Sequence, residues 1–222
     1  MTAPSVILFD VIETLFSLAP LKDRFARHGL PESDADLFFA QLLRDAFALS
    51  AAGVFKPFPE IASGSLRVLL EDRAMAASDD TVKALLAVFA ELPPHPDVRP
   101  ALERVRQSAT CAVLLTNGSR ANTEQLLGRA GLDGLVDDVL SVEDFGVWKP
   151  KPELYQGACR KMGIKPGEAT LIAAHAWDVH GALSAGLRGV WVRRQDSRYH
   201  PAMGEPAGLA HGLSEAVDIA LG

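Results

Sequence analysis

Five short apolar runs, each bounded by turn residues, constrain the fold of this chain more than any other feature of its sequence. Four of them alternate with stretches of helical periodicity, and such alternation is typical of a parallel sheet covered by helices on both faces. The sequence therefore predicts an α/β fold with a mostly parallel sheet. The strands are expected at residues 6–9, 112–115, 139–142, 170–173 and 189–192, and the intervening helices at residues 121–130, 154–162 and 179–185.

The connection between the first two predicted strands is far too long for a simple crossover. A parallel crossover needs about a dozen residues or slightly more, whereas about a hundred residues separate these two strands. The intervening residues have helical patterning throughout. We therefore expect a helical module at residues 16–93, inserted into a core domain made of residues 1–15 and 94–222.

Turn residues divide the insert into four predicted helices. Ser33 or Asp34 is expected to cap the second of these helices, and Gly53 is expected to end it. Ser78 or Asp79 is expected to open the fourth helix. The four helices are expected at residues 21–28, 33–52, 61–76 and 78–90, and further core helices at residues 98–107 and near residues 214–221.

The composition is that of a soluble globular protein with a modest negative charge. Twenty-two Lys and Arg against 28 Asp and Glu give a formal net charge of −6, which argues against a nucleic-acid partner. No apolar run approaches the roughly 18 residues that a membrane span needs, and the first residues lack the pattern of a signal peptide. Two cysteines supply neither a disulfide scaffold nor a four-ligand metal site. We therefore expect a cytoplasmic protein that binds neither nucleic acid nor membrane.

Polar side chains gather where the predicted strands end. Ligands of open α/β sheets bind beyond the carboxyl ends of the strands. Asp10 ends the first strand, and Thr116 and Asn117 end the second. Lys149 follows the third strand and Asp178 follows the fourth. The carboxyl ends of the strands thus bring together two carboxylates, a hydroxyl, an amide and an ammonium. This convergence predicts an active site there.

Four motifs extend this pattern over nearly the whole chain: Asp10-x-x-x-Thr14-Leu15, Thr116-Asn117-Gly118, Lys149-Pro150-x-Pro152-x-x-Tyr155 and Ala176-Trp177-Asp178. In this order and spacing they resemble the haloacid dehalogenase (HAD) superfamily of aspartate-nucleophile hydrolases, and most closely the type II branch that contains the L-2-haloacid dehalogenases. The resemblance implies a Rossmann-like core with an inserted all-helical cap that closes over the strand ends. It also implies a small anionic substrate, no metal or organic cofactor, and a homodimer, since dimers are common in that family.

The resemblance assigns a role to each charged residue at the strand ends. Asp10 would be the nucleophile that forms an ester with the substrate, and Lys149 would keep it ionised. Asp178 would brace Lys149 or direct the water that breaks the ester. Each residue also has a structural alternative: Asp10 as the cap of a turn, Lys149 as an exposed loop lysine, and Asp178 as a helix cap.

Uncharged residues complete the expected site. Thr116 and Asn117 offer hydrogen-bond donors to the substrate, although Asn-Gly also favours a turn. Thr14 is expected to support the nucleophile, and Tyr155 either to contact the substrate or to pack in the core. Ile12, two residues after the nucleophile, completes the expected substrate-binding set.

Two departures separate the chain from the HAD phosphatases. Those enzymes carry an aspartate where this chain has Ile12, and that aspartate protonates the departing alkoxide. General acid catalysis of this kind contributes about 10²–10⁴-fold, whereas a halide leaves without a proton donor. The phosphatases also hold Mg²⁺ with an acidic residue where this chain has Ala174. The sequence therefore favours hydrolytic dehalogenation of a short 2-haloacid.

Two other functions stay open on the sequence alone. A Mg²⁺-dependent phosphatase for a small phosphomonoester would need Glu13 or His175 to replace the absent proton donor. A HAD-fold binding protein without turnover would be consistent with the substitutions at Ala40, Ala173 and Glu13.

The departures from the dehalogenase pattern leave open the roles of Arg44, Glu13 and His175. Arg44 lies one helical turn beyond Ala40, where the family places a cap arginine, so it either takes over that role or is a solvated charge. Glu13 stands where the family has glycine, and it would repel an anionic substrate unless it points away or pairs with Arg44. His175 is expected to act with Asp178 as general base for ester hydrolysis, or to line the pocket as a hydrogen-bonded histidine.

Overall fold

The computed structural model describes residues 3–222 and divides into two compact units. One unit ends at Ser17, resumes at Pro93 and continues to Gly222, and it contains the sheet. The other unit spans Leu18–Leu92 and is helical. The insert expected from the sequence, residues 16–93, differs from this second unit by two residues at its start and one at its end.

The first unit is built on a parallel sheet, which confirms the predicted α/β fold class. In the described residues the sheet has six strands in the order β3-β2-β1-β4-β5-β6. The residues of β1 and β4 are buried throughout, as expected for strands covered on both faces. The strands are β1 Val6–Phe9, β2 Cys111–Thr116, β3 Asp138–Ser141, β4 Ala169–Ala173, β5 Arg188–Val192 and β6 Gly208–Ala210.

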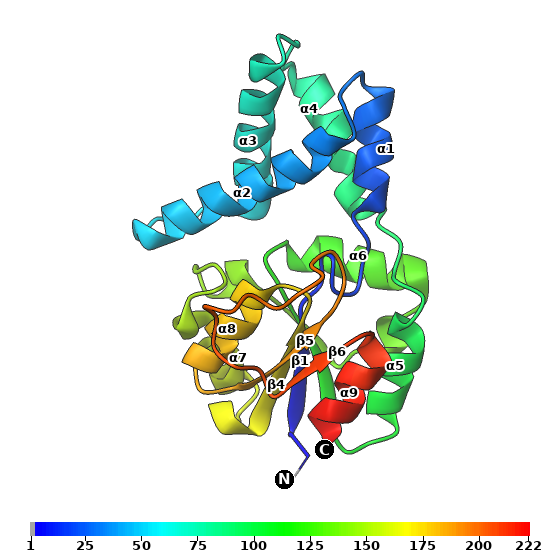
Figure 1. Cartoon of the computed structure of the whole chain (residues 1–222), viewed down its shortest axis with the longest axis vertical. Helices are drawn as coiled ribbons and strands as arrows, with labels where there is room; N and C mark the ends of the chain where they lie inside the picture. Colours follow the sequence, from blue (N-terminus) through cyan, green and yellow to red (C-terminus); the bar gives the residue numbers. More distant parts are fainter. Residues whose placement is uncertain (1–2) are drawn as a thin grey trace. The chain divides into compact units, whose positions relative to one another are not determined.

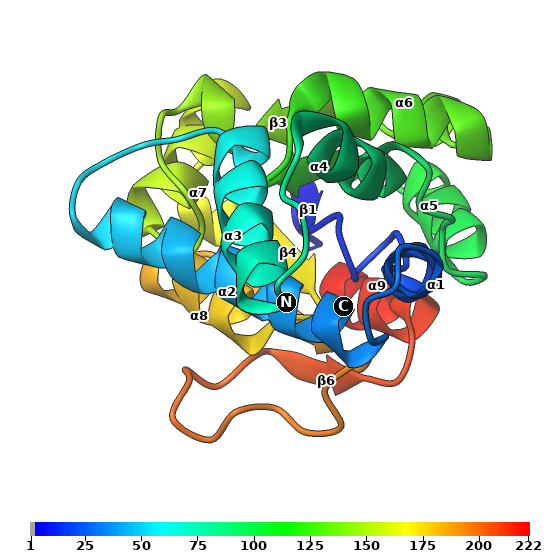
Figure 2. The ribbon, with the colours of Figure 1, turned by 90° about the horizontal axis from the view of Figure 1, so that it is seen from above.

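Helices cover both faces of this sheet. α5 packs against α9 on one face, and α7 packs against α8 on the other (Figure 1). Seen from above, β1 and β4 lie between these two pairs of helices (Figure 2). A glycine with a φ of 62° follows α6, in the left-handed conformation that commonly ends helices. The helices are α5 Val98–Arg106, α6 Arg120–Ala130, α7 Pro152–Lys161, α8 Ala176–Ser184 and α9 Leu213–Leu221.

The second unit is the all-helical module that the sequence predicts. Its interior is apolar, and Phe25, Phe38, Leu42, Leu66 and Leu85 are fully buried in it. Such burial is the main source of stability in a small helical unit. The helices are α1 Ala19–Arg27, α2 Ser33–Ala51, α3 Phe58–Asp72 and α4 Asp79–Leu86, followed by a 3₁₀ turn at Ala87–Ala90.

The predicted helix caps differ in their outcome. Ser78 caps α4, because its hydroxyl accepts a hydrogen bond from a backbone N–H of the first turn. The start of α2 has Glu32 at its N-cap position, and neither Ser33 nor Asp34 caps it. The Asp34 carboxylate is buried and instead accepts two hydrogen bonds from Arg73, at 2.7 and 2.8 Å. A tertiary ion pair thus uses the carboxylate that the sequence assigned to capping.

The sheet differs from its prediction at two places. β6 was not predicted, because it has three residues and its central Leu209 is 55 % exposed, so no apolar run marks it. It pairs with β5 at the edge of the sheet. Val142 begins a 3₁₀ turn instead of ending β3, so the predicted strand at residues 139–142 is shifted by one residue.

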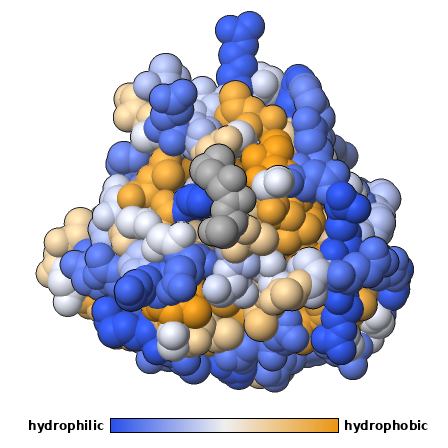
Figure 3. All heavy atoms as spheres, turned by 90° about the horizontal axis from the view of Figure 1, so that it is seen from below, coloured by the Kyte–Doolittle hydropathy of each residue, from blue (hydrophilic) through white to orange (hydrophobic). Residues whose placement is uncertain are grey.

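Figure 3 shows the molecule from below, the end at which β1 begins. Hydrophobic side chains form several patches on this face, and hydrophilic side chains separate them and make up most of the outline. Within residues 3–222, no helix is both long and apolar enough to cross a membrane.

Leu8 in the central strand and Leu209 in the edge strand form a matched pair for a test of stability. Leu8 is 1 % exposed and Leu209 is 55 % exposed. Leu8→Ala is expected to lower the free energy of unfolding by about 2–5 kcal/mol, because it removes buried apolar area and leaves a cavity. Leu209→Ala is expected to change it by less than about 0.5 kcal/mol. Urea denaturation followed by circular dichroism measures both, and equal effects would contradict the central position of β1.

Candidate active site

Three charged side chains meet at the carboxyl ends of the strands. Asp10 directly follows β1, Lys149 lies in the loop after β3, and Asp178 lies in the first turn of α8. Lys149 Nζ donates to Asp10 Oδ1 at 2.8 Å and to Asp178 Oδ2 at 2.7 Å. The side chains of Lys149 and Asp178 are fully buried, and that of Asp10 is 7 % exposed. One buried ammonium thus holds two carboxylates together.

The shared ammonium determines the charge of this cluster. Burial by itself raises the pKa of the Asp10 carboxyl, but Lys149 and then His175 outweigh it, and the pKa lies well below its usual range. Burial lowers the pKa of Lys149, and the two carboxylates more than reverse this, so the pKa is raised. Burial also raises the pKa of Asp178; Lys149 opposes this rise and Asp10 adds to it. Asp10 is therefore the carboxylate that stays charged over the wider pH range.

The loop after β1 holds the second oxygen of Asp10. The Thr14 hydroxyl donates to Asp10 Oδ2 at 2.6 Å and accepts from the backbone N–H of Ala174 at 2.9 Å. It is therefore directed at Asp10 and supports the carboxylate. The Thr14 carbonyl accepts a hydrogen bond from Arg194 at 3.2 Å, and Asp97 binds the same guanidinium at 2.8 Å. Neither Arg194 nor Asp97 is predicted by the sequence motifs, although Arg194 follows β5 by two residues and thus lies at the same ends of the strands as Asp10.

Tyr155 is buried behind Asp178, which favours the core position over the substrate contact that the sequence also leaves open. Its hydroxyl donates to Asp178 Oδ1 at 2.5 Å, and its side chain has no exposed surface. Burial and the Asp178 charge raise the pKa of Tyr155 well above its usual value, so it stays a donor. Gly181 makes this approach feasible, because a Cβ at that position would lie 2.8 Å from the Tyr155 hydroxyl.

His175 lies between two carboxylates. Its Nε2 is 2.7 Å from Glu13 Oε2 and its Nδ1 is 3.3 Å from Asp10 Oδ2, while Trp177 stacks on the ring at a centroid distance of 4.9 Å. Burial lowers the pKa of His175, but the two carboxylates outweigh it and raise the pKa to about 10. A ring protonated at neutral pH has no free lone pair, which favours the hydrogen-bonded alternative for His175 over the general base. Glu13 pairs with this ring, a partner that the sequence did not suggest beside the alternatives of pointing away or pairing with Arg44.

Thr116 and Asn117 shape the turn that leads to Lys149. The Thr116 hydroxyl accepts from the backbone N–H of Gly118 at 2.9 Å. The Asn117 side-chain oxygen accepts from the backbone N–H of Lys149 at 3.3 Å. These contacts are those of the structural alternative, and a substrate contact through the Asn117 amide nitrogen stays a prediction.

Two further residues of the expected substrate-binding set lie in different units. Ile12 is partly exposed in the loop after β1. Arg44 belongs to the helical unit, where its side chain is 65 % exposed and binds the neighbouring Asp45 at 2.8 Å. Substrate contacts of Ile12 and Arg44 stay predictions.

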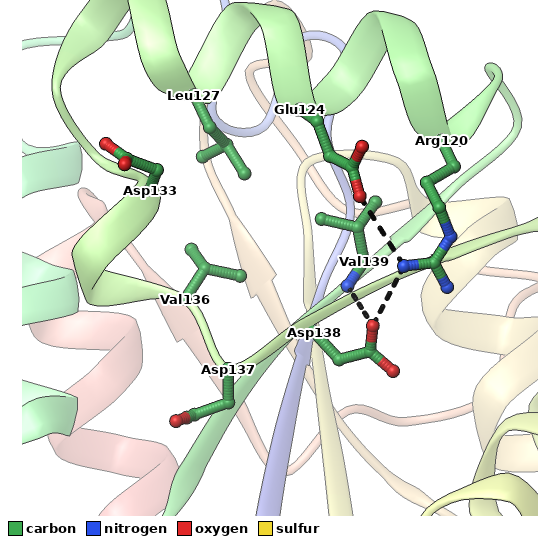
Figure 4. Close-up of a pocket in the computed structure, with 8 residues that line it drawn as sticks. All are labelled: Arg120, Glu124, Leu127, Asp133, Val136, Asp137, Asp138 and Val139. Atoms are coloured by element: carbon green, nitrogen blue, oxygen red, sulfur yellow. Dashed lines mark hydrogen bonds and ion pairs between the residues drawn. The ribbon is translucent and has the colours of Figure 1, made fainter.

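A hollow of about 210 Å³ lies elsewhere in the first unit, between α6 and the start of β3 (Figure 4). Its Arg120 guanidinium lies 3.0 Å from Asp138 Oδ1 and 3.6 Å from Glu124 Oε1, so its charge is already neutralised. In the described part of the chain, none of the residues that line the hollow belongs to the Asp10 cluster. The strand-end cluster, with its buried and mutually bound charges, is therefore the candidate active site.

Comparison with known families agrees with this geometry. Residues 4–186 match the family described as haloacid dehalogenase-like hydrolases. The chain belongs to this family. A relative of this hydrolase over nearly its whole length is the (S)-2-haloacid dehalogenase H-109 of Pseudomonas putida, 26 % identical over 214 residues that cover 96 % of each chain.

Solved structures confirm the haloacid dehalogenase-like fold. The crystal structure of the L-2-haloacid dehalogenase RSc1362 has a TM-score of 0.92 at 23 % identity and covers 100 % of both chains. The L-2-haloacid dehalogenase from Xanthobacter autotrophicus with chloropropionic acid covalently bound has a TM-score of 0.90 at 19 % identity, over 100 % of this chain and 99 % of that one. At these identities the likeness establishes the fold of this haloacid dehalogenase-like hydrolase.

Lys149→Met tests how far the shared ammonium stabilises this haloacid dehalogenase-like hydrolase. Removing one partner from a buried ion pair costs about 3–5 kcal/mol, and we expect the free energy of unfolding to fall by that amount at neutral pH. The folded-state pKa of Asp10 is lowered, so its stabilising effect is present above the unfolded-state pKa and is lost as the pH falls. This loss begins only as the pH passes the unfolded-state pKa of about 3.9, so the deficit of the variant should be smaller at about pH 3 than at about pH 7.

Lys151→Met is the matched control, since Lys151 lies two residues further along and is partly exposed. Urea denaturation of the wild type and both variants at the two pH values measures the effect. A deficit that is the same at both pH values, or equal in the two variants, would contradict the stabilising role of Lys149.

Proposed function

We propose that this hydrolase releases halide from short 2-haloacids, with the Asp10 carboxylate as the nucleophile. The observation that carries the proposal is a nearly buried carboxylate, kept ionised by Lys149 Nζ at 2.8 Å. An ionised oxygen with a lone pair, sheltered from water, is what displacement at carbon needs. The (S)-2-haloacid dehalogenase relative, and the similar fold with chloropropionic acid covalently bound, support this substrate class.

The proposed reaction has two steps. In the first, a lone pair of an Asp10 oxygen attacks the carbon that bears the halogen, the carbon–halogen bond breaks, and the halide leaves with its electron pair. In the second, water attacks Cγ of the resulting ester and passes a proton to Asp178. The bond between Cγ and the former Asp10 oxygen then breaks, and that oxygen leaves in the hydroxy acid with the proton from Asp178. The water oxygen replaces it in Asp10, and one proton is released to solvent.

Ile12 and Ala174 support a halide over an alkoxide as the leaving group. An alkoxide needs a proton donor, and Ile12 stands where the HAD phosphatases place one. A chloride or bromide is the conjugate base of a strong acid and leaves unprotonated. Ala174 stands where the phosphatases hold Mg²⁺ with an acidic residue, and its backbone N–H binds the Thr14 hydroxyl.

The other residues of the site receive auxiliary roles in this proposal. Lys149 keeps Asp10 ionised, and Asp178 receives the proton of the attacking water. Asn117 and Arg44 are the proposed ligands of the substrate carboxylate or the departing halide. The unit Leu18–Leu92 is the proposed cap, and the reaction requires no metal or organic cofactor.

A screen for halide release tests the proposal directly. Chloro-, bromo- and fluoroacetate and both enantiomers of 2-chloropropionate are incubated with the protein, with and without EDTA. We expect release of chloride or bromide that EDTA leaves unchanged. Asp10→Asn is expected to lower the rate by roughly 10⁴–10⁶-fold, the scale on which removal of a nucleophile acts. Asp23→Asn, an exposed aspartate of α1, is the matched control and should keep the wild-type rate.

An isotope experiment tests the covalent ester. A single turnover in ¹⁸O water is expected to place the label in Asp10, because water attacks Cγ and the product takes the original carboxylate oxygen. Peptide mass spectrometry locates the label. Label found in the hydroxy acid alone would show direct attack by water and would contradict the ester.

A further inference from the structure

His175 and Glu13 have no task in the two steps above, yet one of them touches the proposed nucleophile. His175 Nδ1 lies 3.3 Å from Asp10 Oδ2, and Nε2 lies 2.7 Å from Glu13 Oε2. Nδ1 is buried and makes no hydrogen bond within residues 3–222. This nitrogen faces the nucleophile without a closed hydrogen bond at rest, so its contact with Asp10 Oδ2 can shorten when charge develops on that oxygen during the reaction.

The imidazolium form of His175 suits both of its neighbours. The short contact with Glu13 requires a proton on Nε2. A neutral ring would then direct the Nδ1 lone pair at the Asp10 carboxylate, and the two would repel each other. A second proton on Nδ1 replaces this repulsion with an ion pair.

The contact between Glu13 and His175 requires an unfavourable backbone conformation at Glu13. Its φ of 67° lies in the left-handed region, where a residue with a Cβ is strained and glycine is not. The Glu13 N–H donates to the carbonyl of Phe16 at 2.8 Å, and its own carbonyl accepts from His95 Nε2 at 3.1 Å. These bonds fix the conformation that brings the carboxylate to His175. Strain of this kind is typical of functional sites.

We propose that His175, positioned by Glu13, is a cationic hydrogen-bond donor to the oxyanion that forms on Asp10 Oδ2 while the ester is hydrolysed. This inference rests on the proposed function. The Thr14 hydroxyl donates to Oδ2 at 2.6 Å and His175 Nδ1 lies 3.3 Å from the same oxygen, whereas Lys149 binds Oδ1. Donors directed at one oxygen are the pattern of an oxyanion site. Oδ1 is then the oxygen that attacks the substrate.

The electrons of this step balance without a proton from His175. Attack of water on Cγ moves the π pair of the ester carbonyl onto Oδ2, where the negative charge faces His175 and Thr14. Return of that pair to the carbonyl expels Oδ1 with the hydroxy acid, which takes the proton that Asp178 received from water. His175 keeps both protons throughout.

Nuclear magnetic resonance of the resting protein tests the charge of His175. With ¹⁵N-labelled histidine, both ring nitrogens are expected to be protonated at pH 8, because the pKa is raised to about 10. Glu13→Gln removes one of the two carboxylates that face the His175 ring, so in this variant the ring should deprotonate at lower pH than in the wild type. A neutral tautomer at pH 8 in the wild type would overturn the proposal. The charged and titratable groups around the ring and its carboxylates are Asp10, Glu13, Lys149, Asp178 and His95.

Rapid-quench kinetics test the role of His175 in the second step. His175→Asn removes the imidazolium and keeps a polar side chain, and His211→Asn alters an exposed histidine as the matched control. In His175→Asn, we expect one halide per active site to be released in a burst and ester hydrolysis to slow by about 10²–10³-fold, as for loss of an oxyanion donor. Intact-protein mass spectrometry should show the ester accumulating in this variant and not in His211→Asn.

Glu13→Gln separates positioning from simple damage to the fold. It keeps a hydrogen-bond partner for Nε2, so halide release should persist. Ester hydrolysis should slow, and its rate should fall at lower pH than in the wild type.

Ester hydrolysis at the wild-type rate in His175→Asn, or equal slowing of both steps, would overturn the inference. Absence of any halide release from the wild type would overturn the proposed function and this role with it, whereas the resonance experiment reports the charge of His175 in either case.

Discussion

The Lys149 ammonium, held between two buried carboxylates, is the interaction on which the rest of the site depends. Three charges can be buried only if they lie within hydrogen-bond distance of one another, because each unpaired charge carries a large desolvation cost. The parallel sheet provides this proximity: β1 lies beside β4 at its centre, so Asp10 and Asp178 emerge close together. The loop after β3 then brings Lys149 across β2. The order of the strands therefore determines which charged residues meet in the site.

The fold can be predicted from the sequence wherever a buried element appears as a continuous run of apolar residues. β1 and β4 are covered on both faces, so their apolar runs predict them almost to the residue. β6 has no such pattern, since an edge strand of three residues can expose Leu209. Helix ends are set in part by tertiary contacts, and Asp34 illustrates this: its carboxylate binds Arg73, which is 39 residues away in the sequence. Local propensity carries no information on such a partner.

Some features of the site can be predicted from where residues stand in the sequence, and others are visible only in the structure. Asp10, Lys149 and Asp178 could be selected because the carboxyl ends of parallel strands share one edge, and their motifs strengthen that selection. The partners of Glu13 and His175 could not, because they depend on a left-handed backbone conformation that glutamate rarely adopts. Sequence chemistry alone made His175 a plausible base. The carboxylates at its two nitrogens raise its pKa to about 10, which favours a protonated ring without the lone pair that a base needs.

The charges of this cluster explain why a cationic histidine suits hydrolysis of the proposed ester. At rest, two cations, Lys149 and His175, face the carboxylates of Asp10, Asp178 and Glu13. Forming the ester removes the charge of Asp10 and leaves the cations with one fewer anion. The oxyanion of the second step restores that negative charge to the same group. The field of the resting protein thus favours the tetrahedral adduct without rearrangement, which is the basis of electrostatic preorganisation. A neutral histidine would leave the developing oxyanion without this cation.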